Sequence, residues 1–164
     1  MSSSRRGNTS SFVRGLMKSL PNVHWSGIVY LFGSEHEYIT TIKVFEHSDL
    51  APTDHTLKAL VNTVNDAAFI AVDSQTGKTI QCQPGECLFL EYKPNVRKDG
   101  TVEIVYRFAI GRNLTNHTIP GSNITIPEVR AWDHLGIRYD ENGCPIDARV
   151  YRLIPEADFS QLGI

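Results

Sequence analysis

The chain has 164 residues, of which 41% are hydrophobic and 21% charged, a balance typical of a globular protein large enough to bury an ordinary core. It contains no run of about 18 apolar residues, which excludes a membrane-spanning helix. Its first residues also lack the apolar stretch of a signal peptide, so secretion by that route is not expected. The length predicts one folded domain.

The net charge of −2 is unevenly distributed along the sequence. Residues 1–20 carry a charge of +4 with no acidic side chain, and the rest of the chain holds 12 basic and 18 acidic side chains, a charge of −6. Residues 1–11 are rich in Ser and Arg, so we expect a flexible basic arm there. Such an arm either stays solvated or binds an acidic neighbouring subunit or nucleic acid, and nucleic acid is the less favoured partner.

The region after the arm predicts a short helical turn and then two strands. Residues 12–20 have an apolar periodicity that favours a helical turn, which Pro21 ends. Residues 23–32 and 37–45 are rich in β-branched and aromatic side chains. They predict two strands joined by a hairpin loop.

One helix is expected at about 53–66. Thr53 or Asp54 is suited to cap its beginning, and apolar residues follow at the spacing of one helical face. That face is formed by Leu57, Leu60, Val61 and Val64. We expect it to pack against a sheet.

The rest of the sequence alternates in hydrophobicity and predicts a sheet. Further strands are expected at 67–73, 78–81, 87–92, 101–110, 135–139 and 148–154. Turn residues separate them at 74–77, 98–100 and 141–143. The clearest strand is 101–110, in which large apolar residues occupy every second position and predict one buried face.

Residues 111–127 are polar and rich in turn residues, including Pro120, Gly121 and Pro127. We expect a long loop, and loops of that length in compact domains are usually functional or make contacts between subunits. The sequence therefore predicts an inter-subunit or partner contact at 112–127.

The three cysteines, Cys82, Cys87 and Cys144, are odd in number, so a complete internal disulfide framework is impossible. A reducing compartment is the simplest setting. Cys82 and Cys87 have the spacing C-x4-C, but no second pair of ligands follows at the spacing of a zinc site. A core role for Cys87 is favoured, and no metal or cofactor is expected.

Few residues have the arrangement of a catalytic site. Asp133 and His134 are neighbours in a predicted strand and should point to opposite faces, which disfavours a catalytic dyad. Asp54 is better explained as a helix cap. An enzyme using Cys144 or one of the histidines His24, His36 and His47 is the least favoured alternative, because the sequence does not place a base beside the thiol.

Four segments carry a resemblance to known proteins. Ile126-Pro127-Glu128-Val129-Arg130-Ala131-Trp132-Asp133-His134-Leu135-Gly136-Ile137-Arg138-Tyr139 and the stretch Asp158-Phe159-Ser160-Gln161-Leu162-Gly163-Ile164 resemble uncharacterised proteins of phage or prophage-like loci. Gly85-Glu86-Cys87-Leu88-Phe89-Leu90 and Tyr106-Arg107-Phe108-Ala109 are similar to strands in the same group. The resemblance implies a virion or tail-like structural subunit and assigns no functional residue.

These observations lead to one expectation with two rivals. The fold class is α+β or mainly β, a sandwich or barrel with one flanking helix, over a single domain at 12–164 behind the arm at 1–11. The favoured function is a non-enzymatic subunit of a phage or phage-derived particle, a tail tube, neck or related component. It would assemble with its own copies and other particle subunits, in the virion or in the bacterial cytoplasm before assembly. A small binding module of a cellular complex is the first rival and a small enzyme the second.

Overall fold

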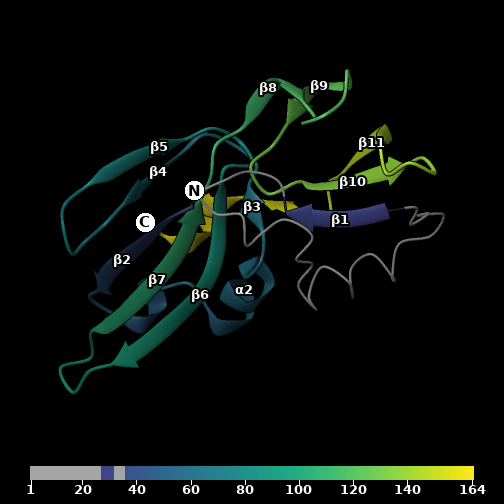
Figure 1. Cartoon of the computed structure of the whole chain (residues 1–164). Coiled ribbons are helices and arrows are strands. Elements are labelled where there is room, and N and C mark those ends of the chain that lie inside the picture. The colour runs from purple at the N-terminus through teal and green to yellow at the C-terminus, as the bar shows by residue number, and fades with distance from the viewer. Residues whose placement is uncertain (1–26, 32–35) are drawn as a thin grey trace. The chain divides into compact units, whose positions relative to one another are not determined.

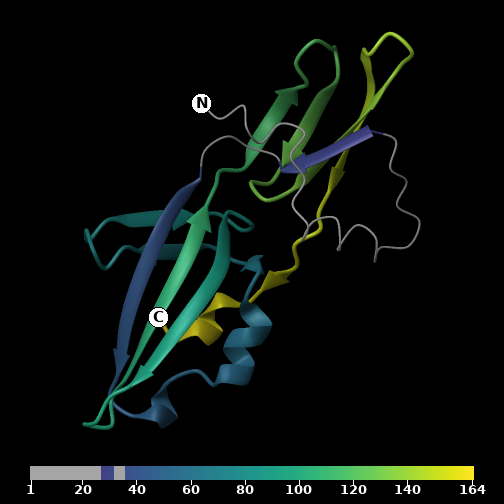
Figure 2. The same cartoon turned by 60° about the horizontal axis from the view of Figure 1, so that its bottom comes forward.

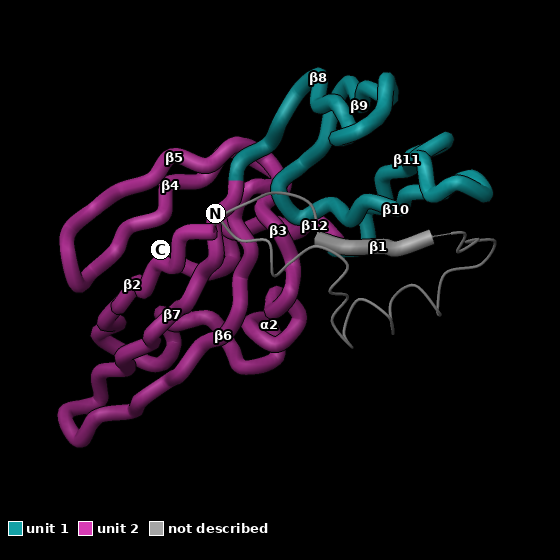
Figure 3. The backbone as a smooth tube through the Cα atoms, viewed as in Figure 1, with its two compact units in different colours: residues 1–35, 112–154 teal, residues 36–111, 155–164 magenta. Residues whose placement is uncertain are grey.

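The computed structural model describes residues 36–164 and the backbone of residues 27–31 (Figure 1). These residues divide into two compact units (Figure 3), each drawn from two separate stretches of the chain. Unit 1 takes residues 1–35 and 112–154, and unit 2 takes residues 36–111 and 155–164. The expected arm at 1–11 and helical turn at 12–20 lie outside the described residues. A single domain over 12–164 stays a prediction.

A five-stranded sheet forms the frame of unit 2. Its strands lie in the order β12 (Glu156–Ala157), β3 (Val64–Asn65), β6 (Cys87–Val96), β7 (Val102–Ile110) and β2 (Glu37–Phe45). The long strands β6, β7 and β2 pair antiparallel, and the short β12 runs parallel to β3. Figure 2 shows the three long strands side by side.

Strand β7 confirms the strongest sequence pattern. Its apolar positions are all buried in the core of unit 2: Val102, Ile104, Tyr106, Phe108 and Ile110. Arg107, at an alternate position, is exposed. The β6–β7 hairpin closes through a turn in which Gly100 has a φ of 89°, a conformation that glycine adopts without steric cost.

The expected helix at 53–66 is only half as long as the periodicity indicated. Helix α2 spans Asp54–Leu60 and begins at a Thr53 cap, whose hydroxyl accepts a hydrogen bond from the Thr56 backbone N–H at 3.2 Å. Asn62 then takes a φ of 64°, and its N–H donates to the Phe89 carbonyl at 2.8 Å. Val64 belongs to β3 and not to the helix. Pairing with β6 replaces the helical hydrogen bonds that would have continued α2.

The core of unit 2 lies on one side of this sheet. The hairpin of β4 (Phe69–Val72) and β5 (Thr79–Cys82) contributes Ala71, Ile80 and Cys82 to it. Helix α2 contributes Leu57 and Leu60. The 3-10 turn η3 (Phe159–Leu162) lies next to α2 (Figure 2) and completes the core. A second 3-10 turn, η2 (Ser48–Leu50), follows β2 and buries no residue.

Unit 1 contains a three-stranded antiparallel sheet and a separate hairpin. The sheet has the order β1 (Gly27–Leu31), β10 (His134–Tyr139) and β11 (Pro145–Tyr151). Strand β11 spans Pro145–Tyr151 and not 148–154. Leu153 and Ile154, which the alternation placed in the strand, lie beyond its end and are buried. The turn expected at 141–143 is confirmed, since Gly143 has a φ of 79° and its N–H donates to the Asp140 carbonyl at 3.1 Å.

The prediction of a long loop at 111–127 is wrong. Most of it forms a hairpin of β8 (Leu114–Thr118) and β9 (Thr125–Val129). Ile119 and Ile126 are buried in a cluster with Val129, Leu135 and Ile137. The hairpin therefore has an apolar core within its own unit, which the abundance of Asn and Thr in its sequence conceals.

The expected fold class is confirmed. Among the described residues the protein is a β-rich α+β fold with one α-helix, α2. Its sheets are open, so the barrel form of the expectation is not adopted. None of the described helices is long and apolar enough to cross a bilayer.

Candidate assembly surface

Strand β2 exposes an apolar strip on the side of the sheet that faces away from the core. Ile39, Thr41 and Phe45 point inward and are buried. Because side chains alternate along a strand, the intervening apolar residues point outward. Their exposed fractions are 61% for Tyr38, 40% for Ile42 and 44% for Val44. Large apolar side chains gathered on one exposed strand favour contact with a partner.

Strand β7 continues this surface beside β2. Val105 lies opposite Ile42 and Arg107 lies opposite Thr40. Ile42, Tyr38, Val44, Val105 and Arg107 are hereafter called the outer sheet face. Val105 is half-buried, and Arg107 is exposed. Side chains directly opposite one another in an antiparallel pair are close enough to act as one surface.

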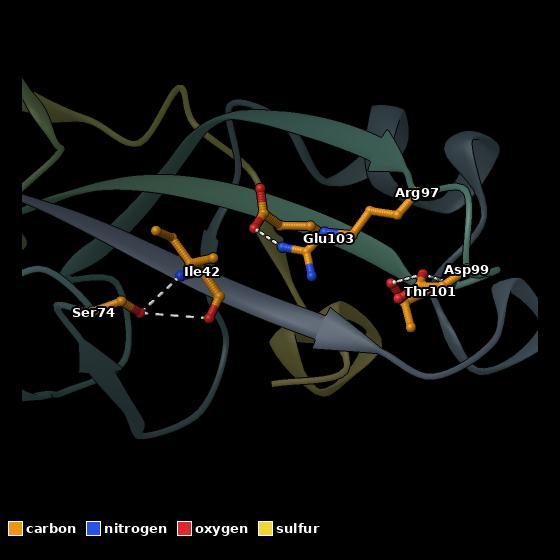
Figure 4. Close-up of polar contacts among 6 residues, drawn as sticks. All are labelled: Ile42, Ser74, Arg97, Asp99, Thr101 and Glu103. Atoms are coloured by element: carbon orange, nitrogen blue, oxygen red, sulfur yellow. Dashed lines mark hydrogen bonds and ion pairs between the residues drawn. The ribbon is translucent and has the colours of Figure 1, made fainter.

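Charged pairs border the outer sheet face along β6 and β7. The Arg107 Nη1 lies 3.5 Å from the Glu91 carboxylate, and the Lys93 Nζ lies 3.8 Å from the same group. Nearer the hairpin tip, Arg97 forms an ion pair with Glu103 (Figure 4). Exposed pairs of this kind contribute little to stability, about 0–1 kcal/mol each. Their two signs instead make this border suited to orienting a partner.

A turn of the same chain occupies the middle of the free edge of β2. Ser74 donates its backbone N–H to the Thr40 carbonyl at 2.9 Å, and its hydroxyl accepts from the Ile42 N–H at 2.8 Å (Figure 4). A strand added at this edge would need these backbone groups. Because Ser74 already binds them, a partner is expected to meet the side chains of the outer sheet face and not the central backbone edge.

The tip of the β6–β7 hairpin is held by Asp99. One carboxylate oxygen of Asp99 accepts from the Thr101 N–H at 2.9 Å and from the Thr101 hydroxyl at 2.6 Å (Figure 4). These hydrogen bonds, led by that of the hydroxyl, lower the pKa of Asp99. The lowered pKa favours the ionised carboxylate, which fixes the turn between β6 and β7.

The residues considered for catalysis are not assembled into a site within the described part of the chain. Cys144 is exposed in the β10–β11 turn, where its N–H donates to the Asp140 carboxylate at 2.9 Å. His36 and His47 flank the two ends of β2, an extended strand of nine residues, which separates them by roughly 30 Å. His24 lies outside the described residues. Nucleophilic catalysis requires a thiol and a base within hydrogen-bonding reach.

Cys82 and Cys87 are both buried in the core of unit 2. Contact with the Cys82 thiol, together with burial, raises the pKa of Cys87. The protonated thiol is therefore favoured, and a thiolate is the form that binds metals. Within residues 36–164, no group of three or more His, Cys, Asp or Glu side chains is arranged to hold a metal ion.

Asp133 and His134 are both buried, but their side chains differ in hydrogen bonding. The Asp133 carboxylate accepts two hydrogen bonds from the Arg152 guanidinium, each at 3.1 Å, and one from the Arg130 N–H at 2.9 Å. Neither ring nitrogen of His134 has a hydrogen-bond partner in the described structure. The two residues do not form a dyad, and the Asp133–Arg152 pair ties the start of β10 to the end of β11.

The Asp54–His55 pair is explained by the first turn of α2. Asp54 accepts a short hydrogen bond from the Tyr92 hydroxyl, and its other oxygen lies 3.0 Å from the Lys58 Nζ. The Tyr92 bond is the larger influence that lowers the pKa of Asp54. The same bond raises the pKa of Tyr92 to about 12. Asp54 therefore joins the helix to β6, a structural role that its position in the sequence only partly indicates.

Comparison with known proteins adds no relative to these observations, since no family model, curated protein or solved structure matches the chain. The outer sheet face is the candidate surface that the sequence pattern did not identify. Alternation in residues 37–45 placed Tyr38, Ile42 and Val44 on one side of the strand. The sequence did not distinguish the exposed side from the buried one, because both sides contain apolar residues.

Proposed function

We propose that the chain is a non-enzymatic structural subunit that assembles with copies of itself into a ring, tube or shell. The observation that supports this most is the outer sheet face, where exposed apolar side chains of β2 are bordered by ion pairs of β6 and β7. Interfaces between subunits commonly combine an apolar centre with a polar rim. The resemblance of residues 126–139 and 158–164 to proteins of phage loci makes a phage or phage-derived particle the proposed setting.

This role requires contacts with copies of the chain and with other subunits of the particle. The proposed location is the virion, or the bacterial cytoplasm before assembly. The basic residues near the beginning of the sequence and the acidic remainder provide opposite charges for attraction between neighbouring copies. Nucleic acid binding through those basic residues is the less favoured alternative.

The test compares the wild-type chain with one apolar-to-charged variant on the proposed surface. Ile42→Lys places a charge in the centre of the outer sheet face, and we expect it to abolish assembly because a lysine would be buried unpaired at the contact. Light scattering should show oligomers or polymers for the wild type and monomers for Ile42→Lys, at unchanged melting temperature. Negative-stain microscopy of the wild type should show rings, tubes or shells.

Ile70→Lys is the matched control. Ile70 is also an exposed isoleucine in a strand of unit 2, on β4, with an exposed fraction of 58%. It should assemble like the wild type. A wild-type chain that stays monomeric at every concentration would contradict the proposal and favour a binding module.

A further inference from the structure

The segment 155–164 is bound by unit 2 much as a separate peptide would be. It follows unit 1 in the chain, yet it belongs to unit 2 together with residues 36–111. Its backbone adds strand β12 beside β3. The Val64 N–H donates to the Pro155 carbonyl and the Asp66 N–H donates to the Ala157 carbonyl, both at 3.0 Å. Main-chain pairing of this kind binds extended peptides to sheet edges in many complexes.

Two apolar side chains anchor the segment in the core. Phe159 and Leu162 have exposed fractions of 3% and 0%. The Phe159 ring meets Phe69 edge to face at a centroid distance of 5.3 Å, and it lies 6.2 Å from Phe108. Such aromatic pairs add about 0.5–1.5 kcal/mol each beyond the burial of their area.

A polar contact fixes the end of the same segment. The buried Tyr106 hydroxyl donates to the Leu162 carbonyl at 2.6 Å, across 56 residues of sequence. A Cβ added to Gly163 would lie 3.3 Å from the Phe45 ring and 3.5 Å from Pro52. The side chains of Phe69, Tyr106, Phe108, Phe45 and Pro52 are hereafter called the acceptor surface. All of them come from residues 36–111.

The acceptor surface does not depend on which copy supplies the segment. Its contacts with 155–164 are made by side chains and backbone groups of unit 2, whereas the residues that directly precede the segment belong to unit 1. The same contacts are therefore available when the segment comes from a second copy. Exchange of an identical element costs little free energy, because each interaction broken within one chain is formed again between two chains.

We propose that, in the assembled state, the segment 155–164 of one copy occupies the acceptor surface of a neighbouring copy. This inference rests on the proposed self-assembly and names the partner segment. Each copy would then give one segment and receive one, a head-to-tail contact that produces a ring when the rotation closes and a filament when it does not. The outer sheet face lies on the other side of the sheet and remains available for a second contact.

The direct test is photo-crosslinking in the full-length chain. Ile164→benzoylphenylalanine places the crosslinker beside Gly163 at an exposed position, so the core is left intact. Assembled and monomeric fractions are separated, irradiated and analysed on a denaturing gel. In the assembled fraction we expect dimers and longer ladders, with cross-links mapping to residues 45–52. In the monomeric fraction we expect cross-links to the same residues within one chain.

Isotope mixing assigns each cross-link to one chain or two. When the crosslinker variant is assembled with a 15N-labelled wild type, peptides that join labelled and unlabelled residues show exchange between copies. Phe159→Asp in the crosslinker variant should abolish the cross-links to 45–52, because the anchor is lost. An assembled fraction that contains only cross-links within one chain would overturn this inference and leave the proposed assembly intact, whereas a chain that never assembles would overturn both.

Discussion

The buried amide of Asn65 organises three backbone groups of unit 2. Its nitrogen donates to the Ala67 carbonyl at 2.7 Å and to the Gln83 carbonyl at 3.0 Å, and its oxygen accepts from the Cys87 N–H at 2.9 Å. The sequence pattern placed Asn65 at the end of a helix, where an exposed polar residue would be ordinary. In the structure it is a fully used hydrogen-bonding residue inside the protein.

Asn65→Ala should therefore be strongly destabilising. It leaves the buried Cys87 N–H without its acceptor, which costs about 1–3 kcal/mol. It also removes the hydrogen bonds to the carbonyls of the exposed residues Ala67 and Gln83. We expect the free energy of unfolding from urea titration to fall by about 1–3 kcal/mol on this basis. Asn95→Ala, at an exposed position of β6, is the control and should stay within about 0.5 kcal/mol of wild type. Similar values for the two variants would contradict this role.

His134 makes the stability of the protein dependent on acid pH. Burial lowers the pKa of His134 to about 4, and the nearby Asp133 acts in the opposite direction with smaller effect. In the unfolded chain the imidazole binds a proton below about pH 6.5, whereas in the folded chain it stays neutral until about pH 4. The contribution of the neutral His134 to the stability is therefore fully present above pH 6.5, and it is lost as the pH falls towards 4.

His134→Leu should remove this component of the acid sensitivity. The variant also removes two ring nitrogens without hydrogen-bond partners in the described structure, so it should be at least as stable as the wild type at pH 7. Urea midpoints measured from pH 7 to pH 4 should fall less steeply for the variant. His55→Leu, at an exposed position of α2, should retain the wild-type slope. An unchanged slope in His134→Leu would show that other groups cause the acid sensitivity.

At the scale of single elements, α2 is stabilised by packing more than by its length. Seven residues are too few for an isolated helix to persist in water, so the burial of Leu57 and Leu60 must hold it. Leu60→Ala should lower the free energy of unfolding by roughly 2–5 kcal/mol. Lys58→Ala loses only an exposed ion pair with Asp54 and should stay within about 0.5 kcal/mol. Equal losses in urea titration would contradict the packing of α2 on the core.

The hairpin β8–β9 changes the expectation for residues 112–127. The sequence favoured a loop that only a partner would order, but Ile119 has an exposed fraction of 1% within its own unit. Ile119→Ala should destabilise unit 1 by about 2–5 kcal/mol, whereas Leu114→Ala, at a position that is 41% exposed, should have a much smaller effect. In hydrogen exchange, the paired hairpin amides of the monomer should already be protected. Fast exchange of these amides would instead support the prediction of a loop that only a partner orders.

Elements with a strong period were predictable, and elements defined by distant partners were not. Residues 101–110 alternate between large apolar and other residues, so β7 was evident from the sequence. The end of α2 was missed because Val61 and Val64 continue the helical spacing, while the positive φ of Asn62 and the pairing of Val64 with Leu88 depend on tertiary contacts. β8 and β9 were missed because Asn116 and Pro127, residue types that are depleted in strands, interrupt them.

The outer sheet face was likewise only partly predictable from the sequence. Alternation along 37–45 grouped Tyr38 with Ile42 and Val44. Which side of β2 faces the core depends on β4, β5, α2 and η3, and no local pattern in the strand contains that information. The Asp133–Arg152 pair likewise joins residues 19 positions apart, a pairing that a sequence rich in both charges leaves undetermined.

At the scale of the whole molecule, the uneven charge gives a prediction about assembly. Deleting residues 2–11 removes Arg5 and Arg6 but little apolar content, so the melting temperature should be nearly unchanged. Association should weaken, and the loss should be larger at low salt, because Coulomb attraction is then less screened. Light scattering over a range of salt concentrations is the measurement. A truncated chain that assembles as well as the full chain at low salt would contradict a role for these residues.

The order in which the chain is synthesised conflicts with the order in which unit 2 is completed. Residues 36–111 leave the ribosome first, but Phe159 and Leu162 follow only after all of residues 112–154. Synthesis proceeds at about 5–20 residues per second. The aromatic side chains that contact Phe159 are therefore made several seconds before Phe159 itself. During that time a nascent chain exposes a core that a finished neighbour can also fill. Under the proposed exchange, neighbouring ribosomes on one message would favour pairing between successive chains, because a completed chain can supply its segment to one that is still being synthesised.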